Sequence, residues 1–554
     1  MNLSSFTCQT RKGSAFLLAL AALASAPLAG QETAPGFTLM APLGSTDTFL
    51  LDAQGEIAHQ WPSNFNPGNA VYLLENGNLL RTIHTRGNIG GSGGGVQEIQ
   101  WDGTVVWDYR YDGTGVLQHH DVEVLPNGNV LMIAWEDKTI QQAVAAGRDP
   151  SLMQGTVFSP DHVIEVQKTG PTSGQIVWEW HLWDHLIQDF DSSQANYGDV
   201  AAHPELVDIN FPAQVVRNGD WAHCNGIDYN PVLDQILISV HNLNEIWVID
   251  HSTTTAEAAG HSGGNSGKGG DLLYRWGNPQ AYRAGTANDQ QFFGQHDATW
   301  IEANYPGQGN ILVFNNGLNR PGPRFSSVDE LEPPVNANGQ YFLAPGSAYG
   351  PAAPVWSYTA PTPTDFYSGA ISGAERLQNG NTLICSGTQG WLFEVDLNQN
   401  LIWEHFNDIP SSTQNSVFKV RRYAHYLWPD RQAMSASAGG QVELQLQAGS
   451  EHAFRSYWLL ASMSGTEPGT PLPGGQSTLP LNHDALGDWF LANLNGPALQ
   501  NFAGNLDASG GAAATLDTLG PLAPSYIGQT VHFAFALRNP WDFASNPMAL
   551  LILP

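Results

Sequence analysis

Six stretches of this chain repeat one pattern: an apolar segment, a polar turn, and a second apolar segment that carries a tryptophan. Alternating apolar and polar residues are typical of strands, and the Asn-Gly and Asp-Gly pairs between them are typical of hairpin turns. A short hairpin cannot bury its apolar face alone, so repeated hairpins must pack against one another. The copies span residues 48–61, 96–109, 163–180, 246–276, 327–358 and 391–405.

A second hairpin precedes five of these copies, which makes four strands per repeat. These hairpins span residues 71–80, 121–132, 225–240, 297–314 and 372–385. Four-stranded repeats are typical of β-propellers. The first copy, residues 36–61, lacks one strand, and residues 417–423 could supply it from the far end of the repeat region. We therefore expect an all-β fold with a six-bladed propeller over residues 36–432, in which the repeated tryptophans pack between blades.

The chain has 554 residues, which leaves room for more than the propeller. Residues 1–30 resemble a secretory signal peptide, with Arg11 and Lys12 before an apolar run and small residues after it. Residues 433–440 are rich in Ser, Ala and Gly and are expected to be a linker. Residues 441–554 contain alternating apolar stretches and many turn signals, so we expect a small C-terminal β-sandwich there.

The charge balance limits the partners of this protein. Asp and Glu number 51 and Lys and Arg 21, a formal net charge of -30, which disfavours nucleic acid and anionic membranes as partners. No run beyond the signal is apolar and long enough to span a bilayer. We expect an exported protein, periplasmic or extracellular, without membrane insertion. Its two cysteines outside the signal, Cys224 and Cys385, are expected to be buried free thiols.

Three histidines stand at matching places in the repeats. His120, His223 and His296 each lie where the first strand of a repeat is expected to begin, and Arg320 follows the strand after His296. The first strands of propeller blades line a central channel, so these side chains should meet at one mouth of it. A single histidine in such a place is usually structural, but three at equivalent positions favour a functional cluster.

Imidazole can act as a nucleophile, an acid, a base or a metal ligand, and arginine binds oxyanions. Together they suit transfer of a sulfuryl or phosphoryl group. Two alternatives stay open: a non-enzymatic secreted propeller that binds a ligand, and a site where the histidines hold Zn²⁺ or Cu²⁺. No HExxH, P-loop or GxSxG motif indicates a common hydrolase or NTPase.

Residues 220–229, Asp-Trp-Ala-His-Cys-Asn-Gly-Ile-Asp-Tyr, resemble a signature of bacterial aryl-sulfate-dependent arylsulfotransferases. Residues 295–298, residues 314–320 and the opening stretch 36–42 are similar to further segments of that family. The resemblance implies an exported six-bladed propeller that needs no cofactor. It also implies transfer of a sulfuryl group from a small aromatic sulfate donor to a phenolic acceptor through a sulfated histidine.

By the same resemblance, His223, His296 and Arg320 would bind and polarise the sulfuryl group. The family's nucleophilic histidine belongs to a later segment, but residues 366–376 contain no histidine. His120 stands at the right kind of position in an earlier repeat. We therefore expect His120 to replace the nucleophile, with His223, His296 and Arg320 beside it.

Overall fold

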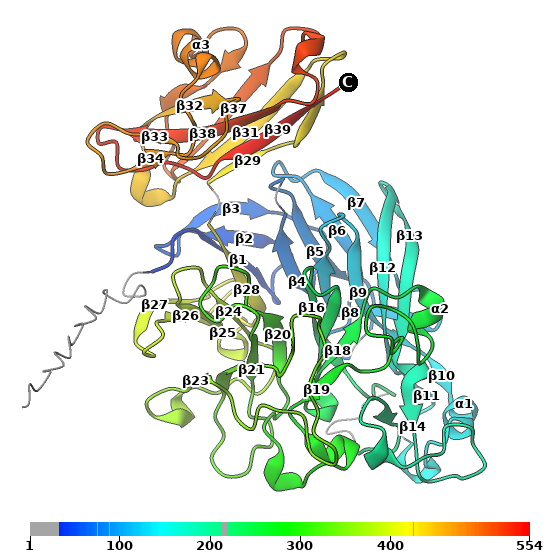
Figure 1. Ribbon diagram of the computed structural model, residues 1–554. Helices are drawn as coiled ribbons and strands as arrows, with labels where there is room; N and C mark the ends of the chain where they lie inside the picture. Colours follow the sequence, from blue (N-terminus) through cyan, green and yellow to red (C-terminus); the bar gives the residue numbers. More distant parts are fainter. Residues whose placement is uncertain (1–32, 75, 88, 154, 213–218, 425) are drawn as a thin grey trace, which may run out of the picture.

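The computed structural model describes residues 33–554 except 75, 88, 154, 213–218 and 425. It is an all-β protein whose strands form many small sheets (Figure 1). The predicted signal peptide, residues 1–30, lies outside the described residues. None of the helices in the described part of the chain has the length and apolarity needed to cross a membrane.

Within the described residues, six sheets between Phe37 and Tyr423 have four antiparallel strands each. The first is β28 (Val417–Tyr423), β1 (Phe37–Pro42), β2 (Thr48–Leu51) and β3 (Ile57–Trp61). The second is β4 (Pro67–Leu73), β5 (Leu79–His84), β6 (Gly94–Ile99) and β7 (Val105–Arg110). The third is β8 (Val116–Val124), β9 (Val130–Glu136), β12 (Asp161–Gly170) and β13 (Ser173–His181).

The other three sheets follow the chain without interruption. The fourth is β16 (Cys224–Asn230), β17 (Gln235–Val240), β18 (Glu245–Asp250) and β19 (Tyr274–Trp276). The fifth is β20 (His296–Trp300), β21 (Ile311–Asn315), β22 (Ser327–Leu331) and β23 (Trp356–Tyr358). The sixth is β24 (Gly373–Arg376), β25 (Thr382–Ser386), β26 (Trp391–Val395) and β27 (Leu401–Phe406).

The prediction that residues 417–423 complete the first sheet is confirmed, because β28 pairs antiparallel with β1. We call the first strand of each sheet its inner strand. Inner strands of successive sheets contact one another in the order β28, β4, β8, β16, β20, β24, and β24 contacts β28 again. This order is consistent with a propeller-like arrangement of the sheets around a common axis.

The repeated tryptophans lie on the last strand of each sheet and bind the following sheet. In each case the indole N–H donates to a group of the next sheet or of its connecting segments. The bonds are Trp61 to Gln100 O, Trp107 to Ser173 O, Trp178 to Thr253 Oγ1, Trp276 to Pro351 O, Trp356 to Leu397 O and Trp403 to Ala53 O. The last of these bonds joins the sixth sheet to the first.

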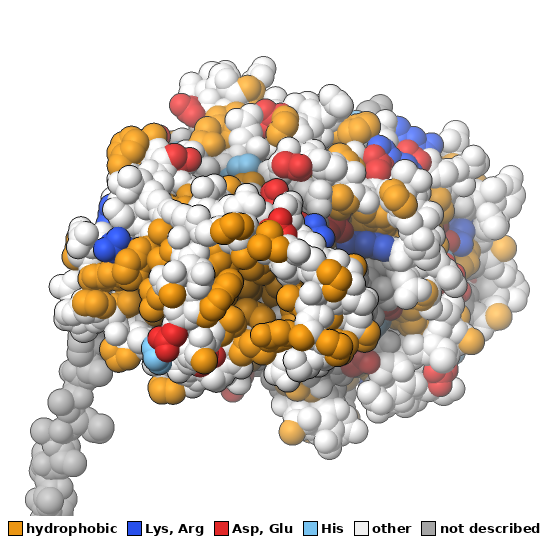
Figure 2. Space-filling model, turned by 90° about the horizontal axis from the view of Figure 1, so that it is seen from above, with side chains coloured by type: hydrophobic (Ala, Val, Ile, Leu, Met, Phe, Trp, Pro, Cys, Tyr) orange, Lys and Arg blue, Asp and Glu red, His pale blue; other side chains and the backbone are white. Residues whose placement is uncertain are grey.

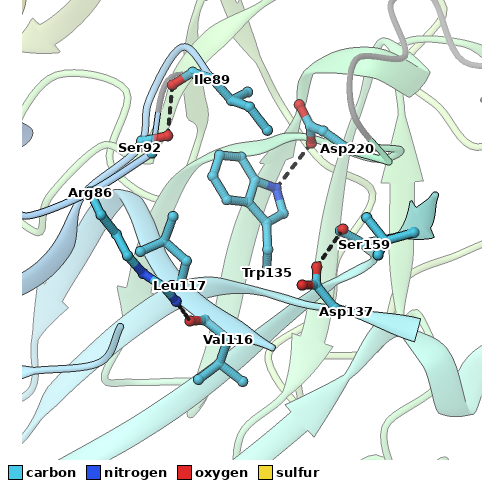
Figure 3. Close-up of a pocket in the computed structure, with 11 residues that line it drawn as sticks. Arg86, Ile89, Ser92, Val116, Leu117, Trp135, Asp137, Ser159 and Asp220 are labelled. Atoms are coloured by element: carbon cyan, nitrogen blue, oxygen red, sulfur yellow. Dashed lines mark hydrogen bonds between the residues drawn. The ribbon is translucent and has the colours of Figure 1, made fainter. Parts of the chain in front are cut away.

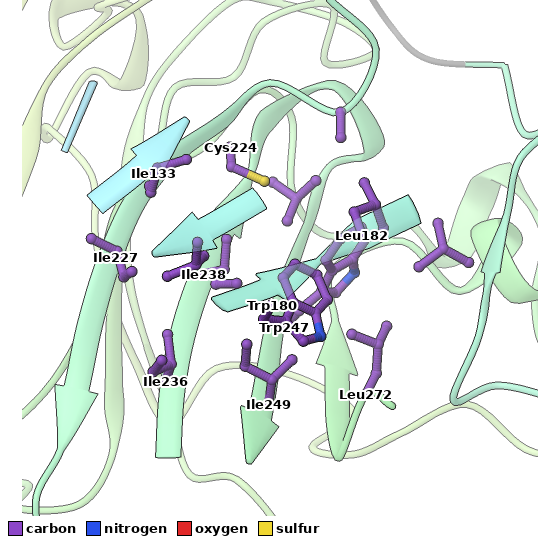
Figure 4. Close-up of a cluster of buried hydrophobic side chains, with 14 of the residues drawn as sticks. Ile133, Trp180, Leu182, Cys224, Ile227, Ile236, Ile238, Trp247, Ile249 and Leu272 are labelled. Carbon is purple, nitrogen blue, oxygen red and sulfur yellow. The ribbon is translucent and has the colours of Figure 1, made fainter. Parts of the chain in front are cut away.

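Hydrophobic cores fill the spaces between adjacent sheets. Between the third and fourth sheets, Ile133, Ile227, Ile238 and Trp247 belong to one buried cluster (Figure 4). Cys224 lies in this cluster, and Cys385 is buried in another; both thiols are free, as predicted.

Two further sheets build the C-terminal region. One is β29 (Leu427–Pro429), β31 (Gln441–Gln447), β37 (Gly511–Asp517) and β35 (Leu499–Gln500). The other is β30 (Ala433–Ser435), β39 (Met548–Leu553), β38 (Thr530–Arg538), β32 (Ser456–Ser462) and β36 (Ala503–Asn505). Buried side chains of both sheets, such as Leu444 and Phe535, share one core. Residues 433–440 are not a free linker, since β30 pairs with β39.

The C-terminal region lies against the first sheet (Figure 1). Ser450 Oγ donates to Asp52 Oδ2 at 2.5 Å, and Gln447 Nε2 donates to Ala58 O at 3.2 Å. Figure 2 shows the molecule from the side on which the C-terminal region lies, and hydrophobic side chains gather on the surface that faces the viewer. The described residues also form three two-stranded sheets: β10 (Lys138–Thr139) with β11 (Val157–Phe158), β14 (Leu186–Ile187) with β15 (Val207–Asp208), and β33 (Thr470–Pro471) with β34 (Thr478–Leu479). Their α-helices are α1 (Ile140–Ala145), α2 (Thr255–Ala258) and α3 (Ala485–Asn493).

Candidate active site

The three predicted histidines stand at irregular points of three consecutive inner strands. His120 lies within β8, His223 directly precedes β16, and His296 is the first residue of β20. The backbone is left-handed at His120 (φ 49°), at His223 (φ 54°) and at Asp297 (φ 51°). The pairing register with the second strand also shifts at each place. Such conformations cost about 1–3 kcal/mol each in non-glycine residues and concentrate at functional sites.

The imidazole rings of these histidines form one continuous row. The ring centroids of His120 and His223 are 4.5 Å apart. His241, which begins the short helix η4 (His241–Leu243) after β17, lies 5.2 Å from His223 and 5.2 Å from His296. The ring of Phe418 on β28 lies 6.0 Å from His120 and 6.2 Å from His296. The structure therefore brings the three predicted histidines together and inserts a fourth between two of them.

His223 is oriented by a carboxylate. Its Nδ1 lies 2.5 Å from Asp220 Oδ2, and Trp135 Nε1 donates to Asp220 Oδ1 at 3.0 Å. An ionised carboxylate only accepts hydrogen bonds, so Nδ1 of His223 carries the proton. In the neutral ring the lone pair is then on Nε2. A carboxylate that holds one nitrogen in this way favours acid–base or nucleophilic chemistry at the other nitrogen.

Asparagine amides orient two other rings. His296 Nδ1 lies 2.7 Å from Asn316 Oδ1, and Asn316 Nδ2 donates to the carbonyl oxygens of Ser368 and Ile371. Those two donations fix the amide so that its oxygen faces His296, which places the ring proton on Nδ1. His241 Nδ1 contacts Asn242 Oδ1 at 2.8 Å in the same manner.

His120 is held by a second histidine. Its Nδ1 lies 2.8 Å from Nδ1 of His119, whose ring stacks on Trp135. His119 Nε2 in turn lies 3.0 Å from Asp161 Oδ1, and both side chains are buried. Gly91, with φ of +85°, packs against the edge of the His120 ring that carries Cε1 and Nε2, where a Cβ would lie 1.8 and 1.9 Å from these atoms. The charge of Asp161 favours a proton on the facing Nε2 of His119, so His120 donates through Nδ1 and has its lone pair on Nε2, on the Gly91 side.

Burial makes these rings hard to protonate. Burial, followed by repulsion from His223, lowers the pKa of His120 well below its usual value. The pKa of His296 is likewise lowered well below its usual value by burial and then by His241. The pKa of His241 is about 4, owing to burial and to His223. These three imidazoles are therefore neutral at neutral pH, with unprotonated nitrogens available.

The residues after the histidines bind the inner strands to one another. Asp297 forms a two-bond ion pair with Arg421 of β28, with distances of 2.6 and 2.9 Å, and accepts from Ala374 N on β24. Lys419 donates to Asp121 at 2.7 Å and to Asp297 at 3.3 Å. Burial alone would raise the pKa of Asp297, but the charges of Arg421 and Lys419 hold it at about 2. These ion pairs keep the histidine-bearing strands in register.

Arg320 stands apart from the row of rings. Its guanidinium lies over Phe325 at 4.3 Å and over Phe293 at 5.2 Å, and Nη2 donates to Ser327 Oγ at 3.4 Å. These contacts join Arg320 to none of the four histidine rings, so the expectation that it meets them at the same rim stays a prediction.

A pocket of about 270 Å³ is lined by Trp135 and Asp220, the groups that contact His119 and His223 (Figure 3). Arg86 faces it from the second sheet. Arg86 Nη2 donates to Val116 O at 2.9 Å. The pocket therefore places a cation and the Asp220 contact within one solvent-accessible space next to the rings.

Several functional candidates were missed from the sequence. His241 lies at the end of a second strand, where the repeat pattern predicts nothing, and His119 precedes the expected position by one residue. The paired amide Asn316 lies in the segment 314–320 that the sequence already singled out. The adjacent His119-His120 and His241-Asn242 pairs are the only local signals.

Comparison with known proteins identifies the family of this chain. The family model described as Arylsulfotransferase (ASST) matches residues 28–428. The arylsulfate sulfotransferase AssT of Escherichia coli O6:H1 (strain CFT073) is 25% identical over 379 residues, covering 63% of this chain and 58% of that protein.

Solved structures show weaker likeness. A protein of unknown function from Bacteroides caccae has a TM-score of 0.40 at 13% identity, covering 70% of this chain and 98% of that chain. A putative 6-phosphogluconolactonase from Bacteroides fragilis has a TM-score of 0.33 at 10% identity, covering 70% and 98%. Likeness at this level supports no conclusion on function, whereas the family match spans most of the sequence. The chain belongs to the arylsulfotransferase (ASST) family.

Proposed function

We propose that this protein is an exported arylsulfotransferase that moves a sulfuryl group from an aryl sulfate to a phenol without a cofactor. The proposal rests on one observation: the rings of three inner-strand histidines and of His241 form one row. The three are His120, His223 and His296. Membership of the family supports transfer over its two alternatives, a non-enzymatic ligand-binding propeller and a histidine-held metal ion.

His120 is the proposed nucleophile. Its Nε2 lone pair attacks sulfur and forms an N–S bond, while the bond between sulfur and the aryl oxygen breaks and the oxygen keeps the electron pair. His223, protonated at Nε2 and stabilised by Asp220, donates that proton to the leaving oxygen. The low pKa of His120 keeps its ring unprotonated and able to attack.

In the second half of the reaction, transfer to the phenol, His223 acts as a base instead of an acid. The phenol oxygen attacks sulfur, His223 removes the phenolic proton through Nε2, and the N–S bond breaks to restore neutral His120. Binding of the anionic aryl sulfate beside His296 favours uptake of a proton from solvent at Nε2, which then donates to a sulfuryl oxygen. Arg320 contributes positive charge from the edge of the site. Partners are thus a small aromatic sulfate and a phenol, and the net charge of -30 argues against nucleic acid.

The same proposal includes the architecture and location. We infer a six-bladed propeller over residues 36–432 and a β-sandwich over residues 441–554. The returning contact of β24 with β28 and the bond of Trp403 to Ala53 support closure of the ring. The shared core of the two C-terminal sheets supports the sandwich. The composition of residues 1–30 supports export to the periplasm or the exterior.

The test is release of nitrophenol from p-nitrophenyl sulfate with phenol as acceptor and no nucleotide. His120→Ala and His223→Ala should each reduce kcat/KM by on the order of 10³-fold or more, as loss of a nucleophile or its acid–base partner does in other enzymes. Without phenol, wild type should release about one nitrophenol per chain, and mass spectrometry should find the sulfuryl group on His120.

His483→Ala is the matched control, because this exposed histidine is also paired with a carboxylate, Asp488 at 2.9 Å. It should retain wild-type rates. Turnover that survives in both His120→Ala and His223→Ala would refute the proposed transferase, and a sulfuryl group on a residue other than His120 would refute its nucleophile.

A further inference from the structure

A second histidine cluster lies at the periphery, between the third and fourth sheets. His185 ends the short helix η2 (Leu182–His185) after β13, whereas His261 and Asp271 belong to the segment between β18 and β19. Asp271 Oδ1 lies 2.8 Å from His185 Nδ1 and 2.7 Å from His261 Nδ1. Among the described residues, this is the one set of three ligand-type side chains whose ligand atoms lie within 4.8 Å of one another.

The proton positions in this cluster are constrained by a backbone carbonyl. His185 Nε2 lies 2.8 Å from Ala258 O, and a carbonyl oxygen only accepts, so Nε2 carries a proton. In a neutral ring, Nδ1 of His185 therefore holds a lone pair that points at a carboxylate oxygen. That nitrogen and the carboxylate oxygen are both of the types that bind a metal ion.

The surroundings of His185 resemble those of a metal-bound histidine. Its side chain is 0% exposed, so neighbouring groups hold the ring in one orientation. Donation from the distal ring nitrogen to a carbonyl is also the usual arrangement around metal-bound histidine, because it fixes the tautomer. The ring of His185 stacks parallel on Trp180, and Trp180 Nε1 donates to Gly270 O beside Asp271. The cluster is thus rigid on two of its three sides.

We propose that His185, His261 and Asp271 bind a divalent transition-metal ion of the Zn²⁺ class. Two imidazole nitrogens and one carboxylate oxygen are ligands that Zn²⁺ accepts, and three protein ligands leave a fourth position open. His261 is 62% exposed, and the adjoining pocket of about 560 Å³ is lined by His261, His203 and Trp183. Ligands of tetrahedral Zn²⁺ lie about 3.3 Å apart. Metal binding therefore requires Asp271 Oδ1 to move away from both imidazole nitrogens, which lie 2.8 and 2.7 Å from it.

Such an ion would add a link to a segment that already contacts β13. Residues 251–271 contain six glycines, and Trp178 and Trp180 of β13 donate to Thr253 and Gly270 within them. An ion bound by the folded chain alone stabilises the folded state. Through His185, the ion would join this segment to the end of β13. The role is structural and independent of the row of histidines at the channel.

The experiment uses the full chain purified without a histidine tag, stripped of metal and titrated with Zn²⁺ by calorimetry, then with Co²⁺ by visible spectroscopy. Wild type should bind one ion per chain, and Co²⁺ should give absorption bands of a site with nitrogen and oxygen ligands. His261→Ala and Asp271→Asn should each weaken the affinity for Zn²⁺ by at least about 10- to 100-fold. Loss of a group that only hydrogen-bonds to a metal ligand already has an effect of that size. Saturating Zn²⁺ should raise the Tm of wild type by about 2 °C or more and leave the Tm of His261→Ala unchanged.

His203→Ala is the matched control, because His203 is also exposed, lines the same pocket and contacts Glu205. It should bind Zn²⁺ like wild type. Equal uptake by wild type, His261→Ala and Asp271→Asn would overturn the proposal, as would no uptake by wild type. His261 is exposed, so its variant should fold and keep both outcomes measurable.

Discussion

The six sheets differ in how strictly their last strands, the outer ends, and their inner strands, the inner ends, keep the repeated residue pattern. On the last strands, one residue type makes one kind of bond in every sheet: a tryptophan N–H donates to the following sheet. On the inner strands, the left-handed or irregular position carries different residues from sheet to sheet. These are Asn69, His120, His223, the His296-Asp297 pair and Ser372. The repeat is strict where every sheet meets the same packing requirement, and it is looser on the inner strands, where three sheets carry histidine and two carry other polar residues.

The two ends also differ in their effect on stability. A tryptophan hydrogen bond contributes about 0.5–1.5 kcal/mol net, and the buried ring adds apolar area. The inner row destabilises the fold through its left-handed backbone. Below about pH 6.5 its buried rings, whose pKa values are lowered, destabilise it further. Substitutions at the inner end should therefore affect catalysis more than stability, and those at the outer end the reverse.

The largest effect in this comparison is expected at Asp220. Asp220→Asn leaves an acceptor for Trp135 but lets the amide hold the wrong tautomer of His223. We predict that kcat falls by on the order of 10²-fold with little change in Tm, measured by nitrophenol release and thermal unfolding. Asp234→Asn is the control, since Asp234 contacts His251 Nδ1 at 2.7 Å away from the row. Equal losses in both variants would contradict a special role for the inner end.

A pH dependence should come from His241, whose pKa is about 4 in the folded protein against about 6.5 when unfolded. Between these values the unfolded chain binds a proton that the folded protein does not, so the free energy of unfolding falls as pH drops from 6.5 toward 4. We predict that His241→Gln weakens this fall, measured by urea unfolding at pH 7 and pH 5. An unchanged difference between the two pH values would argue that the ring is solvated.

Trp403→Phe tests the outer end where the sixth sheet meets the first. It removes the N–H that donates to Ala53 O at 2.8 Å but keeps an aromatic ring. We predict a loss of about 1–2 kcal/mol in the free energy of unfolding with kcat unchanged, measured by denaturant titration and turnover. Trp489→Phe, at a tryptophan that is 46% exposed on α3, should change neither. A large loss of kcat in Trp403→Phe would show that the two ends are not separable.

The smallest effect is expected at Arg320. Its contacts are with Phe293, Phe325 and Ser327 rather than with the rings. We predict that Arg320→Ala raises KM for the aryl sulfate by less than about tenfold, since it removes charge at the edge of the site. Steady-state kinetics over a range of donor concentration would measure this. A fall in kcat comparable to that of Asp220→Asn would move Arg320 into direct contact with the transferring group.

Much of the fold could be predicted because strand alternation and turn residues are local signals. The pairing of residues 417–423 with β1 followed from one missing strand in the first copy. The position of the repeated tryptophans between sheets followed from their fixed place in each repeat. Residues 433–440 were misjudged, because a composition rich in small residues does not show that Met434 pairs with Ile552 across the chain.

Less of the candidate site could be predicted. The repeat places His120, His223 and His296 at equivalent positions, which is enough to expect that they meet. His241 enters the row only because η4 turns it back toward His223, and His119 matters only because its ring bridges His120 and Asp161. Arg320 was expected with them, yet two phenylalanine rings hold its guanidinium aside.

The sequence by itself determined the number and order of the strands in each repeat, the tryptophan at each outer end and the histidines at three inner ends. These features follow from periodicity, which is carried by neighbours in the chain. Only the tertiary structure decided which nitrogen of each imidazole is protonated, because Asp220, Asn316 and His119 reach their partners through left-handed and irregular backbone. Hydrogen-bond direction and burial are properties of the packed state, and they turn three histidines at equivalent positions into an asymmetric candidate site.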